Sequence, residues 1–352
     1  MTIRGMITAT GMLLSVADIG ICYSVGMSPE RLGALSFAWF GFPYIWALTV
    51  VWMLVSMAAR RREVMLACIL ALIATWPSMR RLVSPIGTGD LTGLRETGSG
   101  GDEIKVMTYN IHFAAKTDEK MAAFIERESP DVLCLQEICG REWKENRGEE
   151  KLSAVINSYR YKIYTKSHGG IMILSRLPMQ ELKDSLHTRL ANALVAELTI
   201  DSTKKLTVIG CHLNSIMLTN GEVGSVMDSR LAHDRLTMLR STYEKTLQAS
   251  YVRAVEARIM AEMIKATSGP VVICGDFNDT PASYTYHTIR TSRDLRDTFC
   301  GSGAGVGRTY LGDLPPLKID HILTTQDIKT KRFEQYDVEY SDHRPVAATL
   351  RL

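Results

Sequence analysis

The chain has 352 residues, 46% of them hydrophobic and 22% charged, and this balance excludes a chain that is disordered overall. Its formal net charge of +3 is slight and gives no support for a strongly basic nucleic-acid surface. The length admits one large domain and a smaller unit.

Three apolar runs fill the N-terminal part of the chain. In Gly5–Met27 the only charged residue is Asp18, and Leu32–Ala59 and Val64–Met79 contain no charge. The first two runs are long enough to cross a hydrocarbon core of about 30 Å, whereas the third needs the two arginines that follow it to reach the interface. A cleaved signal peptide is the alternative for the first run, but no small-residue cleavage site follows it. We therefore expect three transmembrane helices that act as an anchor.

The loop between the second and third runs carries the densest basic cluster, Arg60–Arg62. Short loops rich in arginine and lysine stay in the cytoplasm. Three spans then place the C-terminal domain outside the cytoplasm, whereas two spans would leave it inside. We expect an integral membrane protein whose C-terminal domain is extracytoplasmic.

Residues 84–102 are rich in glycine, serine and threonine, which is typical of a flexible linker. The chain is therefore divided into an anchor over 1–83, a linker over 84–102 and a soluble domain over 103–352. About 250 residues are enough to bury a substantial core in that domain.

Seven cysteines leave the redox environment open. Two lie in the apolar runs, and Cys134, Cys211 and Cys274 lie inside strand-like segments, where they are typical of small core residues. Cys139 and Cys300 remain as a candidate pair. No CxxC pattern occurs, so a thiolate zinc site is not indicated.

The soluble domain alternates short apolar segments with helical patterns. The expected strands are Ile104–Tyr109, Val132–Gln136, Ile171–Leu174, Leu194–Ile200, Leu206–Cys211, Val271–Cys274, Ile319–Leu323 and Val346–Leu350. Helices are expected over Asp118–Glu128 and, as a packed pair that covers a sheet, over Ser229–Thr267, which a loop over Met217–Asp228 precedes. A substrate-recognition lid is the alternative for this segment. Near-continuous apolar strands indicate sheets covered on both faces, and therefore a layered protein of helices and sheets.

Polar residues stand repeatedly at the tips of these strands. The segment Val271–Asp279 delivers Asp276 and Asn278 with Phe277 between them, so both polar side chains can point one way. A carboxylate beside an amide suits a hard cation and the phosphate that it neutralises. The alternative is an Asx turn that closes the strand.

The same construction recurs along the chain and favours the first interpretation. Further tips carry Asn110, Glu137, His212, Asp320 with His321, and Asp342 with His343. Each one has a structural alternative, such as a turn cap, a core histidine or an ion pair between Asp320 and Lys318. Together they form the set of groups that a metal-assisted phosphoester hydrolase needs.

The segments TYNI, LQE, CHLNS, GDFND, KIDHIL and SDHRPV, in this order, resemble the endonuclease/exonuclease/phosphatase superfamily, the DNase I-like proteins. The resemblance covers the chain from Ile104 onward and does not include the membrane part. It implies an α+β fold, a four-layer α/β/β/α sandwich with the site at one end, preceded here by the helical anchor. GDFN and SDHRPV are the specific segments, whereas TYNI or LQE alone would be weak.

Carried over position by position, the resemblance implies roles for the residues at the tips. The metal ligands would be Glu137, Asn110 and Asp342, and the metal Mg²⁺, with Mn²⁺ as a substitute. The catalytic residues would be His212, Asp276, Asn278, Asp320 and His343. Asp276 and Asn278 would orient water and hold the phosphate, His343 supported by Asp320 would polarise it or act as base, and His212 would serve the leaving oxygen. Arg176 and Tyr310 are weaker candidates for substrate binding, and Arg308 and Lys318 lie near the Asp320 strand.

The expected function is therefore a membrane-anchored, Mg²⁺-dependent phosphodiesterase that uses in-line attack by water. Its substrate would be a nucleic acid or a phospholipid or inositol-type phosphodiester, and its other partner the lipid bilayer, with no protein partner indicated. The alternative is a catalytically inactive, membrane-bound binding or scaffold module of the same fold. The enzyme is favoured because the chain retains Glu137, His212, Asp276, Asn278, Asp320, Asp342 and His343.

Overall fold

A computed structural model of the chain describes residues 2–84, 103–116, 119–167, 169–183, 185, 188–215, 232–312 and 317–352. For residues 232–239 it describes the backbone only. The expected loop over Met217–Asp228 lies outside the described residues, and so does the expected linker after Ser84.

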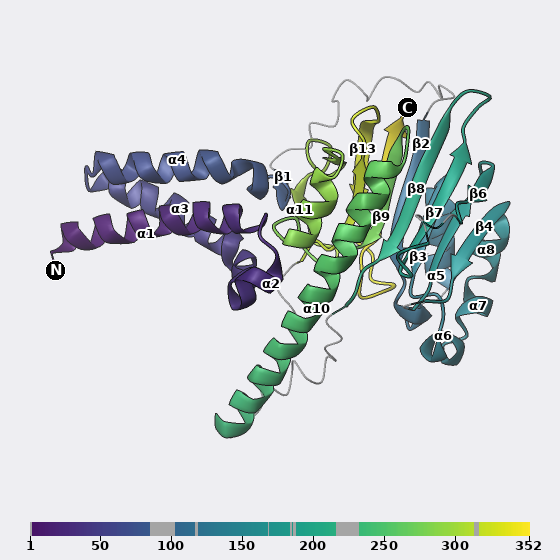
Figure 1. The fold of residues 1–352 in the computed structure, drawn as a ribbon, viewed down its shortest axis with the longest axis horizontal. Coiled ribbons are helices and arrows are strands. Elements are labelled where there is room, and N and C mark those ends of the chain that lie inside the picture. Colours follow the sequence, from purple (N-terminus) through teal and green to yellow (C-terminus); the bar gives the residue numbers. More distant parts are fainter. Residues whose placement is uncertain are drawn as a thin grey trace.

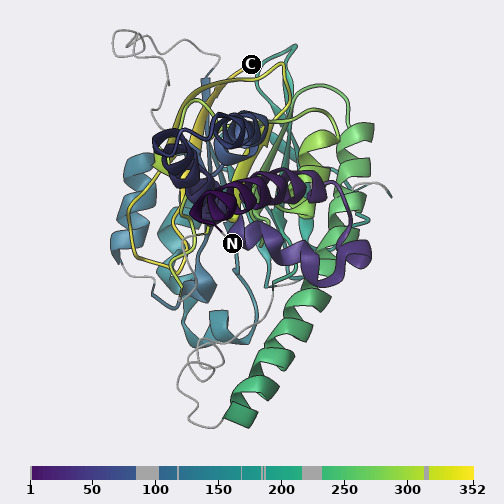
Figure 2. The same ribbon diagram turned by 90° about the vertical axis from the view of Figure 1, so that its left-hand side faces the viewer.

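The N-terminal part folds into three long helices. They are α1 (Ile3–Ser24), α3 (Ala38–Ala58) and α4 (Arg62–Met79), with α2 (Pro29–Leu32) and the 3₁₀ helix η1 (Gly33–Phe37) between the first two. Figure 1 shows the three long helices side by side, projecting away from the rest of the molecule, and Figure 2 views them from their free end. Three helical segments, Ile3–Ser24, Pro29–Ala58 and Arg62–Met79, are long and apolar enough to cross a membrane.

Small and polar residues of the three helices face one another. On α1 the buried positions Gly11, Ser15, Asp18 and Ile21 recur at helical spacing and form one stripe. Asp18 is fully buried within this bundle. The apolar side chains point outward, since large residues such as Leu13 and Leu70 are more than 60% exposed. This inside-out distribution is what a lipid-facing bundle requires.

Two six-stranded sheets form the rest of the molecule. One has the order β13-β14-β2-β3-β5-β4, with bounds Lys329–Gln335, Val346–Arg351, Glu103–Asn110, Val132–Gln136, Ile171–Ser175 and Tyr161–Thr165. The other has the order β10-β12-β9-β8-β7-β6, with bounds Arg296–Asp297, Asp320–Thr324, Val271–Asp276, Lys205–His212, Ala193–Thr199 and Met179–Glu181. All eight expected strands are therefore present.

Helices lie on the outer faces of both sheets. The first is covered by α5 (Glu119–Glu128), α6 (Arg141–Glu145), α7 (Gly148–Lys151) and α8 (Ser153–Ser158), and the second by α10 (Ala232–Ala266) and α11 (Tyr284–Thr291). Apolar side chains from both inner faces, among them Val106, Ile173, Val208 and Ile322, form the central core. The four-layer α/β/β/α sandwich is thus confirmed.

One structural expectation is wrong, and one pairing that the sequence left open is absent. Residues 232–266 form one continuous helix and not a helix pair, because no glycine or proline interrupts the segment. Cys139 and Cys300 are not bonded, and all seven cysteines are free. The Sγ of Cys139 lies 3.2 Å from the carbonyl of Lys166, whereas that of Cys300 lies 3.7 Å from the carbonyl of Arg80. The core assignment of Cys134 and Cys274 holds, since their sulfurs meet 3.0 Å apart between the sheets.

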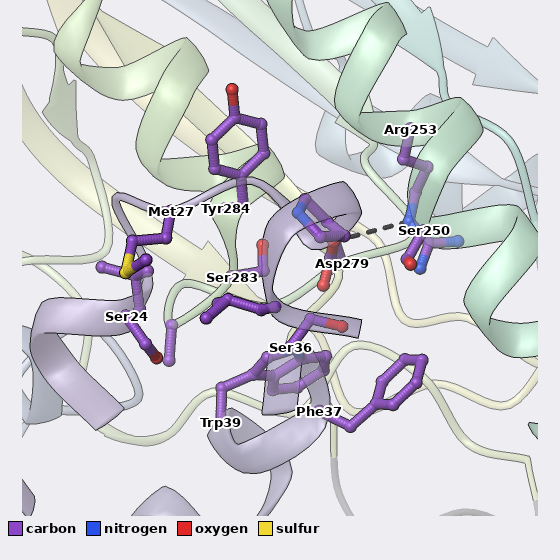
Figure 3. A pocket seen from close by; sticks show the side chains of 14 residues that line it. Ser24, Met27, Ser36, Phe37, Trp39, Ser250, Arg253, Asp279, Ser283 and Tyr284 are labelled. Carbon is purple, nitrogen blue, oxygen red and sulfur yellow. Dashed lines mark hydrogen bonds and ion pairs between the residues drawn. The ribbon is translucent and has the colours of Figure 1, made fainter. Parts of the chain in front are cut away.

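The helical bundle docks directly on the sandwich. The short strand β1 (Val83–Ser84) pairs with β11 (Gly305–Val306), and Glu30 forms a 2.8 Å ion pair with Arg258 of α10. Figure 3 shows the cavity between these parts, whose volume of about 20 Å³ has room for roughly one water molecule. This junction is therefore a packed contact and not a substrate pocket.

Candidate active site

Strand pairing brings the polar tips to one edge of the sandwich. In the parallel pair β2–β3, Asn110 lies beside Gln136, the residue before Glu137, and in the parallel pair β8–β9 His212 lies beside Asp276. Two parallel strands end at the same edge, so the sequence separation of these groups disappears. The antiparallel strand β12 begins at this edge with Asp320.

A glycine makes the contact between the two strands that carry His212 and Asp276. Gly275 has a φ of +147°, and a Cβ at this position would lie 1.9 Å from the carbonyl oxygen of Cys211. Only glycine avoids that collision. The glycine of the GDFN segment therefore allows β8 and β9 to approach each other closely.

Asp276 is the centre of the hydrogen bonds at this edge. Its carboxylate accepts from the side chain of Asn110 at 3.1 Å, from the backbone N–H of Asn278 at 2.7 Å, and from the side chain of Asn278 at 3.3 Å. Asn278 reaches it from a left-handed conformation with φ +49°, and not by strand alternation as expected. The turn and the convergence of side chains are thus one feature, because the Asx turn itself brings the amide to the carboxylate.

Two carboxylates face each other across one imidazole. Asp276 and Asp320 are direct partners in the antiparallel pair β9–β12, where like charges oppose each other. His343 lies 2.9 Å from Asp320 through Nδ1 and 3.8 Å from Asp276 through Nε2, and all three are buried. Burial lowers the pKa of His343, but the two carboxylates outweigh it and raise it to about 10. The ring is therefore an imidazolium at neutral pH.

The pKa of Asp276 is shifted upward, whereas that of an ordinary acid in an ion pair is shifted downward. Burial, followed by the charge of Asp320, raises its pKa to about 6, although His343 and His212 favour the ionised form. The other oxygen of Asp320, Oδ1, is buried and accepts no hydrogen bond from the described residues. Buried charge is thus left unbalanced here, which is common where substrate or metal completes a site.

His212 is a second imidazole beside Asp276. Its Nε2 is 3.7 Å from Glu137 and 3.8 Å from Asp276, and the residue is 7% exposed. The Nε2 atoms of His212 and His343 therefore both approach Oδ2 of Asp276.

Glu137 and Asp342 form a more open rim, and Asn110 joins them. The side chain of Asn110 donates to Oε1 of Glu137 at 3.0 Å, while Ser341 donates through its hydroxyl to the carbonyl of Asn110 at 2.8 Å. The same hydroxyl lies 3.2 Å from Oδ1 of Asp342. The side chains of Glu137 and Asp342 are 17% and 27% exposed, so water reaches both.

This rim fits a hydrated magnesium ion. Mg²⁺ prefers oxygen ligands, keeps several waters and is held in proteins by one or two carboxylates. One oxygen of Glu137 is fixed by Asn110, and the other receives no hydrogen bond from the described residues. Glu137 and Asp342 would hold such an ion, as the resemblance implies. Asn110 serves as a donor here, because its amide nitrogen faces the carboxylates while its oxygen accepts from the backbone N–H of His112 at 3.1 Å.

The buried trio of Asp276, Asp320 and His343 is the one place among the described residues where three ligand atoms lie within 4.8 Å of one another. An imidazolium cannot ligate a cation, because both ring nitrogens carry hydrogens. The trio is therefore suited to an anion at its imidazole edge, beside a metal at the rim.

Of the two weaker candidates for substrate binding, one lies at the site and the other does not. Tyr310 lies at the site, since its ring packs edge-on against His343 with centroids 5.2 Å apart. Arg176 lies at the opposite end of the sheet, because β5 runs antiparallel to β3 and ends beside Val132. There its guanidinium covers the ring of Tyr159 and bonds a backbone carbonyl, so its assignment to substrate binding is wrong.

Lys318 is too deeply buried to contact a substrate. It is 1% exposed and forms a 2.7 Å ion pair with Asp297, not with Asp320. His321 is buried between the rings of Phe277 and Tyr286 and donates to the carbonyl of Asp279 at 3.0 Å. Burial, followed by the charge of Lys318, lowers the pKa of His321 to about 4, so it is a neutral core ring.

Two residues of α10, Arg253 and Glu256, fix the loops of the site. No sequence pattern was a reason to select them. Arg253 lies 3.4 Å from Asp279 and donates to the carbonyl of Asn214, while Glu256 accepts from the backbone of Asn214 and from Asn192. These contacts fix the segments that follow His212 and Asp276. The helical pattern assigns arginine and glutamate to the face opposite the apolar one, so no signal in the sequence indicated these contacts.

Thr309 supports the His343–Asp320 pair from behind. Its buried hydroxyl accepts from the backbone N–H groups of Ile319 and Asp320 at 3.0 Å, and its carbonyl accepts from Arg344 at 2.7 Å. A single threonine thus ties together the two segments that carry the imidazole and its carboxylate.

With this geometry established, the model of the Endonuclease/Exonuclease/phosphatase family matches residues 107–343. The chain belongs to this family. Membership gives it the fold of phosphoester hydrolases, which typically depend on a divalent metal ion. The N-terminal residues 4–82 match a separate domain of unknown function, DUF8431. A search of curated proteins finds no match.

Solved structures of the same fold are similar to about 70% of the chain. An endonuclease/exonuclease/phosphatase from Beutenbergia cavernae is 20% identical, with 71% of this chain and 72% of that chain covered and a TM-score of 0.45. D. rerio TDP2 complexed with single-strand DNA product is 16% identical, with 71% and 99% covered and a TM-score of 0.48. A 3′ phosphatase from Neisseria bound to product DNA hairpin is 18% identical, with 70% and 98% covered and a TM-score of 0.46.

Proposed function

We propose that the chain is a membrane-anchored, Mg²⁺-dependent phosphodiesterase that attacks its substrate with water, Mn²⁺ being a substitute for Mg²⁺. One observation carries the proposal. The buried group of Asp276, Asp320 and His343 and the more exposed carboxylates of Glu137 and Asp342 meet at one edge, joined by Asn110. The groups that we propose for anion binding, proton transfer and metal binding thus lie side by side.

His343 binds the phosphate rather than abstracting a proton. It stands between two carboxylates and is positively charged, so its Nε2–H can donate to a phosphoryl oxygen. Asp320 fixes the ring orientation through Nδ1. Magnesium, when bound, neutralises charge on the phosphate and lowers the pKa of a bound water.

Asp276 takes the proton from the attacking water. Its pKa of about 6 keeps it ionised at neutral pH and makes it a better base than an exposed aspartate. Asn110 and Asn278 hold its two oxygens and thereby its orientation. His212 lies beside Asp276, where it can donate a proton to the departing oxygen.

The bilayer is the second partner. The lipid-facing exposure of the three helices and their direct contact with the sandwich support an anchor that keeps the enzyme at a membrane surface. Met79, at the C-terminal end of α4, packs on Ala282 of the sandwich, so Arg60–Arg62 lie at the remote end of the bundle. By the rule for basic loops, that end is cytoplasmic and the catalytic domain extracytoplasmic.

The activity is tested by incubating the purified full chain with bis-p-nitrophenyl phosphate. We expect hydrolysis with Mg²⁺ or Mn²⁺, loss of hydrolysis in EDTA, and recovery when Mg²⁺ is restored. No turnover of any phosphodiester under all metal conditions would instead favour the inactive scaffold. Cleavage of the soluble domain by protease added to spheroplasts tests the side of the membrane, and protection of that domain would contradict our topology.

A further inference from the structure

A second cavity, of about 510 Å³, opens beside the metal-binding rim. Its walls include Phe113, Cys139, Gly140, Arg141, Glu142, Glu145, Lys166 and Gly169. Its volume lies in the range of small-molecule sites. The resemblance of the sequence to phosphoester hydrolases assigned no role to any of these residues.

The cavity lies close to the site at Gly169, which lines it and also neighbours Glu137. Gly169 has a φ of +81°, and a Cβ there would lie 3.4 Å from the ring of Phe113 and 3.6 Å from Cγ of Glu137. The backbone pairs of Glu137 with Gly170 and of Cys139 with Gly169 hold this wall in place. Whatever occupies the cavity therefore lies next to a phosphate at the rim.

The ring of Phe113 is presented by an unusual turn. His112, Phe113 and Ala114 have φ values of +48°, +50° and +59°, three consecutive non-glycine residues in the left-handed region. Such a conformation is strained, because it brings the Cβ close to the following carbonyl oxygen. Hydrogen bonds from Asn146 to the carbonyl of Phe113 and from Lys151 to that of Ala114 maintain it. Strain of this kind persists where surrounding structure enforces it, and it is concentrated at ligand sites.

The side chains that line the cavity determine which kind of ligand fits it. Phe113 supplies an aromatic face, while the charged side chains are of both signs: Arg141 and Lys166 against Glu142 and Glu145. Arg141 is neutralised by Glu145 at 2.7 Å. No aliphatic side chain among the described residues lines the cavity, so it does not suit an acyl chain, and the balanced charge of those residues does not suit a second phosphate. A planar heteroaromatic ring with both donors and acceptors on its edge satisfies these walls.

We propose that this cavity is a base-binding subsite: a nucleobase stacks on Phe113 and presents its polar edge to Glu142 and Arg141 while its phosphate lies at the rim. This rests on the proposed function and narrows its substrate class to nucleic acids or nucleotide esters rather than phospholipids. Lys166, for which the described residues provide no ion pair, borders the same cavity at its exposed edge.

Binding without turnover tests the subsite separately from catalysis. Full-length chain in detergent and EDTA is titrated with thymidine 5′-monophosphate and with phosphocholine by NMR. We expect the nucleotide to bind at least about tenfold more tightly than phosphocholine, because stacking of one base contributes about that factor or more. Phe113→Leu, which keeps an apolar side chain, should lower nucleotide affinity about tenfold, and Glu142→Ala should lower it too.

Tyr164→Ala is the matched control. Tyr164 is 55% exposed on β4 and does not line the cavity, so its loss should leave nucleotide affinity unchanged within twofold. In the presence of Mg²⁺, Phe113→Leu should lower kcat/KM for a dinucleoside monophosphate about tenfold and leave that for glycerophosphocholine unchanged. Equal binding of nucleotide and phosphocholine, or unchanged nucleotide affinity in both cavity variants, would overturn the subsite even in an active enzyme. Loss of activity with retained, Phe113-dependent binding would instead overturn the hydrolase.

Discussion

Two buried charged clusters lie in the same sheet and differ in their balance. Asp297 pairs with Lys318 at 2.7 Å and accepts from Tyr286 at 2.8 Å, so one negative charge meets one positive charge. At the site edge, Asp276 and Asp320 oppose each other across His343, and Oδ1 of Asp320 accepts no hydrogen bond from the described residues. Burial of charge alone therefore does not mark function in this fold. Unbalanced burial does, because the balanced pair needs nothing further whereas the site edge needs a ligand.

Neutralising one acid of the unbalanced cluster should have the largest effect. Asp276→Asn removes the proposed base and should lower kcat about 10³-fold, within the range typical of positioned acid–base groups. Because it also removes one of two opposed buried carboxylates, the variant should melt no lower than the wild type. Steady-state kinetics and thermal melting in detergent check both outcomes. A variant that is inactive because it has unfolded would contradict the comparison.

A substitution in the balanced cluster should instead lower stability and leave activity nearly unchanged. Lys318→Met leaves Asp297 buried without its counter-charge and should reduce the free energy of unfolding by about 3–5 kcal/mol. Denaturant titration of the full chain measures this loss. Lys318→Met combined with Asp297→Asn should recover part of the stability, and hydrolysis below the melting temperature should stay near the wild-type rate. A stable single variant would show that the pair contributes little.

A substitution in the rim should change the metal dependence of the activity rather than the stability of the protein. Glu137→Gln keeps the hydrogen bond from Asn110 but removes the charge that would hold the cation, so about tenfold more Mg²⁺ should be needed for half-maximal rate. Glu149→Gln, on the exposed surface of α7, is the matched control. An unchanged magnesium titration would remove Glu137 from the ligand set.

The two clusters should respond to pH with opposite signs in EDTA. The pKa of Asp276 is raised in the folded chain, so the folded state binds more protons and this group adds stability as pH falls from about 6 toward 4. For Asp297, burial raises the pKa but the ammonium of Lys318 lowers it by more, and the net pKa lies below the ordinary value. Its contribution is present above about pH 4 and is lost as pH falls below that.

Comparison of variants isolates each contribution. The difference in unfolding free energy between wild type and Asp276→Asn should change between pH 6 and 4, and that between wild type and Asp297→Asn should change below pH 4. Parallel pH profiles for the two differences would mean that the clusters are equivalent in charge balance.

The smallest effect is expected at the far end of the sheet. Arg176→Gln removes a cation–π contact with Tyr159, which is worth about 0.5–1 kcal/mol where exposed. Hydrolysis should stay within twofold of the wild type under all substrate conditions. A fall of tenfold or more in kcat/KM would restore Arg176 to substrate binding.

Much of this molecule could be predicted because the relevant signals are local. Apolar runs and strand periodicity identified all eight predicted strands, and polar residues at strand tips identified the site edge. The convergence of Glu137, His212, Asp276 and His343 follows from strand direction, which the sequence resemblance supplied. The roles of these residues stay predictions until they are tested by substitution.

What could not be predicted depends on register and on contacts between distant segments. Arg176 follows a strand as the site residues do, but its strand is antiparallel and ends at the opposite edge. Lys318 is two residues from Asp320, yet its partner is Asp297, 21 residues away. The left-handed turn at Phe113 was not predicted, because Phe113 and Ala114 belong to residue types that rarely adopt a positive φ.

Hydrolysis in ¹⁸O-labelled water, with wild type and Asp276→Asn compared side by side, tests the central claim most directly. We predict that the wild type with Mg²⁺ places one ¹⁸O in the phosphate product and none in the released alcohol, and that the variant forms almost no labelled phosphate. Label in the alcohol, or equal labelled phosphate from both proteins, would contradict a site in which Asp276 activates water against phosphorus.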